Sequence, residues 1–333
     1  MRLVDDLGLL ALPGDLRRVE SALEAAVRVD DRFLGDVASH LLGAGGKRLR
    51  PTLTLCAAYA VAGEPGLPDL TRPPSEMDRA VTGGASVELV HLGSLYHDDV
   101  IDEAETRRSV PSVNARWSNI VAILSGDFLL AQASVLAASL GADVAGLLAA
   151  TIGELCRGQV LELQYLFNPA RTEESYFSAI EGKTASLLAT SARIGGMVTG
   201  APAPTLDALT RFGHHLGMCF QIVDDVLDVT RTEAELGKPV GNDLLEGVYT
   251  LPVIYAIEAS SDLADLLGRT LDPERLEQAR ALVANEDSVE AAMAVARTHA
   301  TKATEALTGA DDLDPLVCRR LADLVETLTG RTR

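Results

Sequence analysis

The chain has 333 residues, of which 47% are hydrophobic and only 4% aromatic, and its formal net charge is −19. A chain of this length and composition can bury a large core. Its acidity argues against nucleic acid or an anionic membrane surface as a general partner, because the overall field repels both. An anionic ligand must therefore be held by local basic residues or by metal ions.

The cysteines and the apolar stretches indicate a soluble, cytoplasmic protein. Cys56, Cys156, Cys219 and Cys318 lie far apart, without the paired spacing of a zinc site or a disulfide framework, and we expect them to be buried packing residues. The N-terminal segment has acidic residues and a Pro-Gly pair in its apolar run, unlike a signal peptide. Apolar stretches such as "LAASLGADVAGLLAA" are broken by Gly and Asp, so we expect no integral membrane segment.

In chain order, helical segments separated by short breakers account for nearly the whole sequence. Ala and Leu are abundant, and no period-two alternation is flanked by hairpin turns, which favours helix over sheet. The breakers are "GAGGKRLRP" at 43–51, "GEPGLPDLTRPPSE" at 63–76, "NPA" at 168–170, "GAPAPT" at 200–205 and "LGKPVGND" at 236–243. None resembles a flexible linker, so we predict one all-α domain over residues 1–333, with a core at about 45–255 and C-terminal helices at 256–333.

Two aspartate clusters end apolar helical stretches. "YHDDVIDEAETRR" runs from Tyr96 to Arg108, and "QIVDDVLD" runs from Gln221 to Asp228. Side chains four residues apart share one helix face, so Asp98 and Asp102 point together with Asp99 beside them. Asp224, Asp225 and Asp228 repeat the arrangement. Hard oxygen ligands of this kind suit Mg²⁺, which is usually completed by waters and substrate phosphates.

The alternative is that both clusters are solvated helix faces. Their flanks argue against it, because "VELVHLGSLYH" and "LGMCFQIV" are mostly apolar. Charge at the end of a buried helical stretch is costly and is more often functional. We therefore expect two clusters that hold one diphosphate through bridging metal ions.

On "HDDVID", "DDVLD" and their order, the chain resembles the trans-isoprenyl diphosphate synthase family, also called polyprenyl synthetases, from about Gly45 to Tyr255. The resemblance implies an all-α bundle around a deep central cavity and a prenyltransferase that works as a homodimer. It also implies Mg²⁺, about three ions per site, bridged by an allylic diphosphate. The reaction would be a head-to-tail condensation of that diphosphate with isopentenyl diphosphate by ionisation, condensation and elimination.

Basic residues accompany the first cluster. "GGKRLRP" places Lys47, Arg48 and Arg50 after two glycines, where they could hold a metal-free diphosphate or form a plain basic loop. The resemblance assigns Lys47 and Arg50 to isopentenyl diphosphate, together with His91, which is otherwise a core histidine. It assigns Arg107 to the allylic diphosphate and Arg108 to the isopentenyl one. As plain sequence, both arginines could equally be counterions to Glu103 and Glu105.

Further polar residues match the family one by one. "EGKTASLL" contains Lys183 and Thr184, "FQIVDD" contains Gln221, and "LGKPVGND" contains Lys238. Each alone is explained by capping or surface charge. The resemblance implies that the lysines bind the leaving diphosphate and that the Thr184 and Gln221 oxygens stabilise developing positive charge. Val248, in "EGVYTLP", departs from the family, where many members have a lysine that touches the allylic diphosphate.

Product length should depend on the residues before Asp98. Gly93 and Ser94 are small where short-chain family members often have bulky aromatics, which predicts an open pocket. We expect a product of about eight to ten isoprene units, of the kind used as a quinone tail. A farnesyl- or geranylgeranyl-length product is the alternative. Product release could involve transient membrane contact.

Three rival readings remain. A metal-dependent phosphohydrolase could use His97-Asp98 but leaves "GGKRLRP", "GKT" and the second cluster unexplained. A terpene cyclase shares the ionisation site but does not need a second diphosphate pocket. A non-catalytic or partner-dependent subunit of a synthase has Val248 as its main support.

Overall fold

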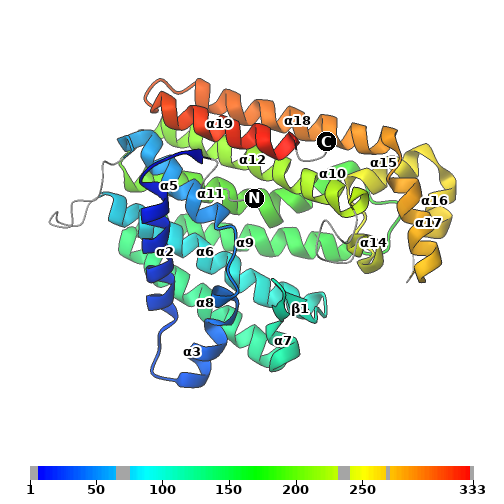
Figure 1. The fold of residues 1–333 in the computed structure, drawn as a ribbon, viewed down its shortest axis with the longest axis horizontal. Helices are drawn as coiled ribbons and strands as arrows, with labels where there is room; N and C mark the ends of the chain where they lie inside the picture. The colour runs from blue at the N-terminus through cyan, green and yellow to red at the C-terminus, as the bar shows by residue number, and fades with distance from the viewer. Residues whose placement is uncertain (1–6, 65–75, 232–240, 268–270, 331–333) are drawn as a thin grey trace. The chain divides into compact units, whose positions relative to one another are not determined.

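The computed structural model describes residues 7–64, 76–231, 241–267 and 271–330. Almost all of them lie in helices, which confirms the all-α fold class (Figure 1). The elements are α2 (Leu12–Val27), α3 (Arg32–Ala38), α4 (His40–Gly43), α5 (Leu49–Ala62), α6 (Glu76–Ile101), β1 (Thr106–Arg107), β2 (Val110–Pro111), α7 (Val113–Arg116), α8 (Asn119–Leu140), α9 (Ala142–Gln164), α10 (Glu173–Ile180), the π-helical turn η1 (Glu181–Ala185), α11 (Ser186–Val198), α12 (Ala203–Thr230), α14 (Asn242–Glu246), α15 (Leu251–Ala259), α16 (Ser261–Leu266), α17 (Pro273–Val283), α18 (Glu286–Thr308) and α19 (Pro315–Thr329).

The chain divides into two compact units, each built from separate stretches. The first comprises Met1–Ile152, Leu187–Gly213 and Leu307–Leu321, and the second comprises Gly153–Ser186, His214–Ala306 and Ala322–Arg333. The first aspartate cluster belongs to the first unit and the second cluster to the second unit. The single domain with a central cavity stays a prediction.

In the first unit, α6 packs against α2, α5 and α8 (Figure 1). Helix α6 has buried residues all around its circumference, as expected for a helix enclosed by others. Small residues let it approach α8 closely: a Cβ at Gly126 would lie 2.3 Å from the His97 Nε2. This close approach fixes the part of α6 that carries the first cluster.

The second unit has two apolar clusters. One contains Tyr176, Met218 and Ile222 and is completed by residues of α15 and α18. The other contains Val229, Tyr249 and Val253 with residues of α16 and α17. Ile222 and Val229 flank the second aspartate cluster in the sequence, and the Tyr176 hydroxyl bonds to Asp225. The apolar packing of these residues therefore anchors that end of α12.

A short hairpin follows the first cluster, which the sequence did not predict. Strands β1 and β2 are antiparallel, with Arg107 opposite Val110. Arg108 and Ser109 form the turn, both with positive φ, at 53° and 63°. A two-residue hairpin turn requires such angles and usually uses Asn or Gly. The sequence carries neither residue there, so the usual signal was missing.

Two further expectations need correction. Cys156 is exposed on α9 rather than buried, whereas Cys56 and Cys219 are buried and Cys318 is intermediate; all four are free thiols. Helices α8 and α9 are long and apolar enough to cross a membrane, with mean hydropathies of 1.9 and 1.3. This is a weak indication, because core helices of soluble proteins pass the same test. The stretch "LAASLGADVAGLLAA" is broken as expected, because α8 ends at Leu140 before Gly141 and α9 begins at Ala142, but α8 alone already reaches spanning length.

Candidate functional site

The first cluster lies at the C-terminal end of α6. Asp98 and Asp99 are in the last turn, and Asp102 follows the helix by one residue. The Asp102 N–H donates to the Asp98 carbonyl over 2.8 Å, which continues the helical path by one residue. Asp98 and Asp102 are therefore one turn apart, as their spacing predicted.

Asp99 is fully buried and paired with Arg107. The Arg107 Nε donates to Asp99 Oδ1 over 2.6 Å. Asp99 Oδ2 is buried and has no hydrogen-bond partner among the described residues. Burial raises the pKa of Asp99 despite Arg107. Arg107 thus pairs with Asp99 rather than with Glu103 or Glu105, the counterions that the plain sequence suggested.

Of the cations in "GGKRLRP", Arg48 forms part of the buried framework. It begins α5 with a left-handed φ of 47°, and its guanidinium binds Glu20 over 2.5 Å and Glu88 over 2.9 Å. Burial opposes its charge, but the two carboxylates outweigh burial and raise the pKa of Arg48. These ion pairs fix Arg48 between the exposed Lys47, which precedes it, and the half-buried Arg50, which lies in the first turn of α5.

Arg50, Arg108 and His91 form an electropositive group. Burial, reinforced by Arg108, lowers the pKa of Arg50 to about 10, and the Arg50 Nε has no hydrogen-bond partner among the described residues. Burial and then Arg50 and Arg108 lower the pKa of His91 well below its usual value, so the imidazole is neutral at pH 7. The carboxylate of Glu88 faces the charges of Arg48, Arg50 and Arg108, but burial outweighs them and raises the pKa of Glu88. An anion would relieve the repulsion within this group.

Arg108 reaches this group from the strained hairpin turn. Its Nη1 donates to the Leu41 carbonyl over 3.2 Å and also to the Gly45 carbonyl. A Cβ at Gly46 would lie 3.0 Å from the Arg108 guanidinium, so the absence of a side chain there gives the arginine its space. Backbone strain of this kind is typical of functional sites.

The two residues expected to leave a pocket open differ in their surroundings. Gly93 is buried, and a Cβ there would lie 3.0 Å from the Gly126 carbonyl oxygen and 3.2 Å from Leu130. Ser94 is half-buried, and its hydroxyl donates to the His91 carbonyl over 2.8 Å. The structure therefore gives Gly93 a packing role between α6 and α8, and the pocket-floor role stays a prediction.

The second cluster lies near the end of α12. Asp224 is exposed, whereas Asp225 and Asp228 are buried. The Tyr176 hydroxyl donates to Asp225 Oδ2 over 2.6 Å, and the Gln221 Nε2 donates to Asp225 Oδ1 over 2.8 Å. Burial, opposed by these two bonds, raises the pKa of Asp225 to about 7. Asp228 is bonded through Oδ2 to the Asp243 N–H at 3.4 Å.

Lys183 and Thr184 lie in η1, an irregular turn of a type frequent at functional sites. The Lys183 Nζ donates to Glu162 over 2.5 Å, and the Thr184 hydroxyl donates to the Gln221 Oε1 over 2.7 Å. Thr184, Gln221 and Asp225 therefore form one hydrogen-bonded chain. The structure thus brings together three of the predicted residues of this unit.

Two predicted positions remain. Lys238 lies outside the described residues. Val248 is half-buried in the turn after α14, and its N–H donates to the Asp243 carbonyl over 2.7 Å. Sequence reasoning did not find Glu88 or Tyr176, because a single carboxylate or tyrosine in a helix has no spacing signal.

The carboxylates fit Mg²⁺ by donor type. The described residues contain no group of three His, Cys, Asp or Glu side chains placed to hold a metal ion by themselves. Magnesium usually needs only one or two carboxylates plus substrate phosphates. The unpartnered Asp99 Oδ2 and the exposed Asp224 are hard oxygen donors of the required kind.

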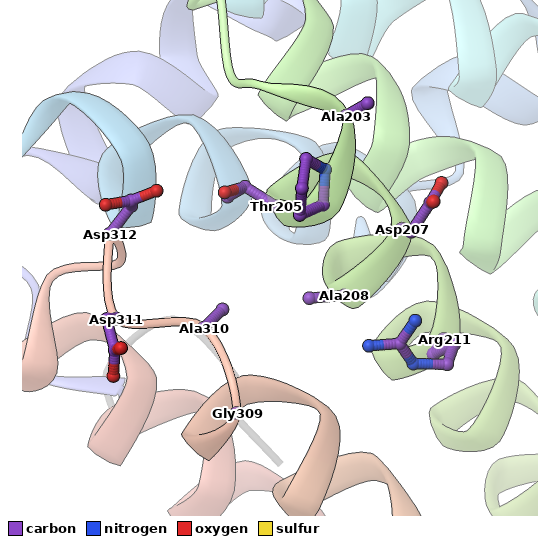
Figure 2. Close-up of a pocket in the computed structure, with 10 residues that line it drawn as sticks. Ala203, Thr205, Asp207, Ala208, Arg211, Gly309, Ala310, Asp311 and Asp312 are labelled. Atoms are coloured by element: carbon purple, nitrogen blue, oxygen red, sulfur yellow. The ribbon is translucent and has the colours of Figure 1, made fainter.

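A separate pocket of 560 Å³ lies in the first unit between the start of α12 and the segment before α19. Figure 2 shows Asp207 and Arg211 on the helix and Asp311 and Asp312 on the facing segment. It contains none of the predicted site residues, and its three aspartates outnumber the single arginine. It is poorly suited to a diphosphate.

The comparisons with known proteins agree with one another. The polyprenyl synthetase family model matches residues 31–285. Component 2 of the heptaprenyl diphosphate synthase of Geobacillus stearothermophilus is 40% identical over 90% of each chain. The decaprenyl diphosphate synthase of Rhodobacter capsulatus is 34% identical, with a TM-score of 0.86 over 99% of each chain. A polyprenyl synthase of Caulobacter crescentus, crystallised with calcium and isoprenyl diphosphate, is 29% identical, with a TM-score of 0.88 over 99% of this chain and 98% of that one.

Proposed function

The chain belongs to the polyprenyl synthetase family, and we propose that it makes a long-chain trans-polyprenyl diphosphate from an allylic diphosphate and isopentenyl diphosphate. It is a prenyltransferase of the all-α isoprenoid synthase fold.

The observation that carries the proposal is the electropositive group of Arg50, Arg108 and neutral His91 in the unit that holds the first aspartate cluster. We assign it, with the exposed Lys47, to the diphosphate of isopentenyl diphosphate. A neutral imidazole can donate one hydrogen bond to an anion without adding charge. Terpene cyclases and phosphohydrolases do not require a second diphosphate pocket of this kind.

The allylic diphosphate is assigned to Arg107, Lys183 and Lys238, with Mg²⁺ held by the aspartate clusters, which are Asp98, Asp99 and Asp102, and Asp224, Asp225 and Asp228. About three ions are expected. When bound, Mg²⁺ supplies charge neutralisation that stabilises the leaving diphosphate as the carbon–oxygen bond breaks. The donor set and the calcium-bound relative support this assignment.

The chain's own groups then act on the organic part. We assign the oxygens of Thr184 and Gln221 to the developing positive charge on the allylic carbon. The Gln221 Nε2 donates to Asp225, and the Gln221 Oε1 accepts from the Thr184 hydroxyl, so these two bonds fix the orientation of the amide. The isopentenyl group is held close, so that its double bond attacks the cation. A proton then leaves the new chain to the departed diphosphate, and the product is longer by one isoprene unit.

The product is proposed to have about eight to ten isoprene units, since a pocket of sufficient depth sets chain length. The names of the heptaprenyl and decaprenyl relatives support a long chain. A geranylgeranyl or farnesyl product is the alternative, and the packing of Gly93 against α8 removes one argument against it.

The chain is proposed to work as a cytoplasmic homodimer. Helix α8 exposes Ile120, Ile123, Leu124 and Val135, which a second copy would cover. A partner-dependent subunit is the second candidate, because the Geobacillus relative is named component 2 of its synthase and Val248 replaces a cation. Transient membrane contact would serve only release of the apolar product.

The test is to incubate the purified chain with Mg²⁺, isopentenyl diphosphate and farnesyl or geranylgeranyl diphosphate, and to size the dephosphorylated products. A ladder ending near eight to ten units is expected. A stop at four units would retain the synthase and reject the long chain. Diphosphate binding without elongation would favour the partner-dependent subunit, and Val248→Lys would then be assayed for restored elongation.

A further inference from the structure

Arg171 is a buried cation that the proposed reaction does not use. It is 4% exposed and immediately precedes Thr172, whose hydroxyl caps the start of α10. Burial lowers the pKa of Arg171, while Glu162, Tyr176 and Asp225 oppose the shift. A guanidinium stays charged under such a shift, so a full positive charge lies inside the second unit.

The contacts of Arg171 are incomplete for a side chain whose purpose is stability. Its Nη1 donates to the Tyr249 carbonyl over 3.0 Å, and its Cζ lies 5.6 Å from the centre of the Tyr176 ring. Nε and Nη2 are buried and have no hydrogen-bond partner among the described residues. Buried donors without partners cost free energy, so stability alone does not account for this arginine.

Each contact of Arg171 leads to the second aspartate cluster. The Tyr176 ring lies under the guanidinium, and its hydroxyl donates to Asp225 over 2.6 Å. Asp225 in turn accepts from Gln221, whose Oε1 accepts from Thr184. A shift of Tyr176 would therefore move Asp225 and rotate the Gln221 amide.

The second contact reaches the turn that carries Val248. The Val248 N–H donates to the Asp243 carbonyl, and the Asp243 N–H donates to Asp228 Oδ2 over 3.4 Å, so this turn also leads to the second cluster. Tyr249 is buried directly after Val248, and its carbonyl is the acceptor of Arg171 Nη1.

Glu162 and Asp225 are buried carboxylates whose charges act on Arg171, and Lys183 pairs with Glu162. Arg171 is a further cation acting on both carboxylates, so its loss would leave buried negative charge undercompensated.

We propose that Arg171 is a positioning residue that, through the Tyr176 ring and the Tyr249 carbonyl, holds the second aspartate cluster in the geometry that binds magnesium diphosphate. The inference rests on the proposed function for its catalytic consequence only. It adds to that function a residue that touches neither substrate nor metal.

The experiment compares Arg171→Met, Arg171→Lys, Tyr176→Phe and the double variant Arg171→Met/Tyr176→Phe with the wild-type chain. Arg193→Met is the control, because Arg193 is paired with Asp207 in the other unit. Three quantities are measured: kcat against Mg²⁺ concentration, the Kd of inorganic diphosphate with Mg²⁺ by calorimetry, and the unfolding midpoint.

Arg171→Met is expected to weaken Mg²⁺-dependent diphosphate binding and to lower kcat, each by about ten-fold or more, as for other residues that orient metal ligands. Arg171→Lys should recover part of the loss because it keeps the charge. The double variant should lose less than the product of the single losses, because both residues act along one path.

The inference is overturned if Arg171→Met matches Arg193→Met in Mg²⁺ dependence and diphosphate Kd, even with a lowered unfolding midpoint. It is also overturned if the losses in the double variant multiply. If Arg171→Met does not fold, Arg171→Lys and Tyr176→Phe decide by the same readouts. Should the wild type fail to elongate while the diphosphate Kd follows the expected pattern, the proposed function fails and the positioning role stands.

Discussion

At the scale of single residues, Gly93 distinguishes packing from pocket lining. A Cβ at this position would meet the Gly126 carbonyl and Leu130, and a backbone atom cannot move away easily. We expect Gly93→Ala to destabilise the fold by about 1 to 3 kcal/mol through overpacking. Urea unfolding measures the change, and Ser94→Ala, which loses one local hydrogen bond, is the control. Equal stability of the two variants would restore the open-floor interpretation.

The histidines at the centre of α12 and on α18 predict an acid-sensitive fold. His299 Nδ1 lies 3.1 Å from His215 Nδ1, and burial, Lys302 and His214 lower the pKa of His299 to about 4. The folded state thus favours the neutral His299 ring. Burial also lowers the pKa of His214, and the nearby Glu181 offsets that second shift only in part. The folded-state pKa of His299 is below the unfolded value of about 6.5, so this contribution is complete above that pH and is lost progressively as the pH falls toward 4.

His299→Gln tests this pH dependence. The variant keeps a polar side chain that does not titrate, so its free energy of unfolding should fall less steeply between pH 6.5 and 4 than that of the wild type. Denaturant unfolding at several pH values measures the two slopes. Parallel slopes would show that His299 is not the group responsible.

At the scale of elements, the turn η1 depends on a close approach to α9. A Cβ at Gly158 would lie 2.4 Å from the Lys183 N and 2.7 Å from the Ala179 carbonyl oxygen, both backbone atoms. Gly158→Ala should therefore displace the turn that carries Lys183 and Thr184. We expect a loss of several kcal/mol, on the order of the largest overpacking effects, and a steep fall in kcat.

Gly153 provides the matched control on the same helix. A Cβ there meets nothing within 4 Å. Gly153→Ala should be neutral or stabilise α9 by up to about 1 kcal/mol, because alanine reduces the conformational freedom of the unfolded chain. Thermal unfolding and turnover of both variants are compared. Similar effects of the two substitutions would contradict the close approach of α9 and η1.

The elements also show what the sequence could not predict. Helices and their breakers follow from local patterns, and α6 and α12 carry the aspartates where spacing indicated. The hairpin at Arg108 and the π-helical turn at Lys183 were missed, because non-local contacts impose both conformations on residues without the usual signals. The Arg48–Glu88 pair was also missed, because its two residues are 40 positions apart in the sequence and meet only when α5 packs against α6.

At the scale of the whole molecule, the candidate site could be predicted further than the fold's assembly. Residue types and spacing indicated the aspartates, because metal binding needs hard oxygen donors, whereas the roles of Lys47, Arg50 and His91 came only from the family resemblance, and all of these assignments stay predictions. The sequence did not show which aspartates of a cluster are buried: Asp225 is bonded to Tyr176 and Gln221 inside the protein, whereas the neighbouring Asp224 is exposed. No sequence motif marks the surface that contacts another chain. That surface is inferred only from the apolar residues that the fold leaves exposed.

The exposed face of α8 yields the last prediction. Leu124 is 61% exposed in α8, whose most apolar stretch of 18 residues has a mean hydropathy of 1.9 and is only 33% buried. If a second copy covers this face, Leu124→Asp buries an unpaired charge in the interface and should shift the protein from dimer to monomer. Light scattering after size exclusion measures the mass. Leu10→Asp, at a residue 87% exposed outside α8, is the control and should leave the mass unchanged. A wild-type monomer would instead assign the face to a different partner chain, which is the arrangement that the partner-dependent candidate requires.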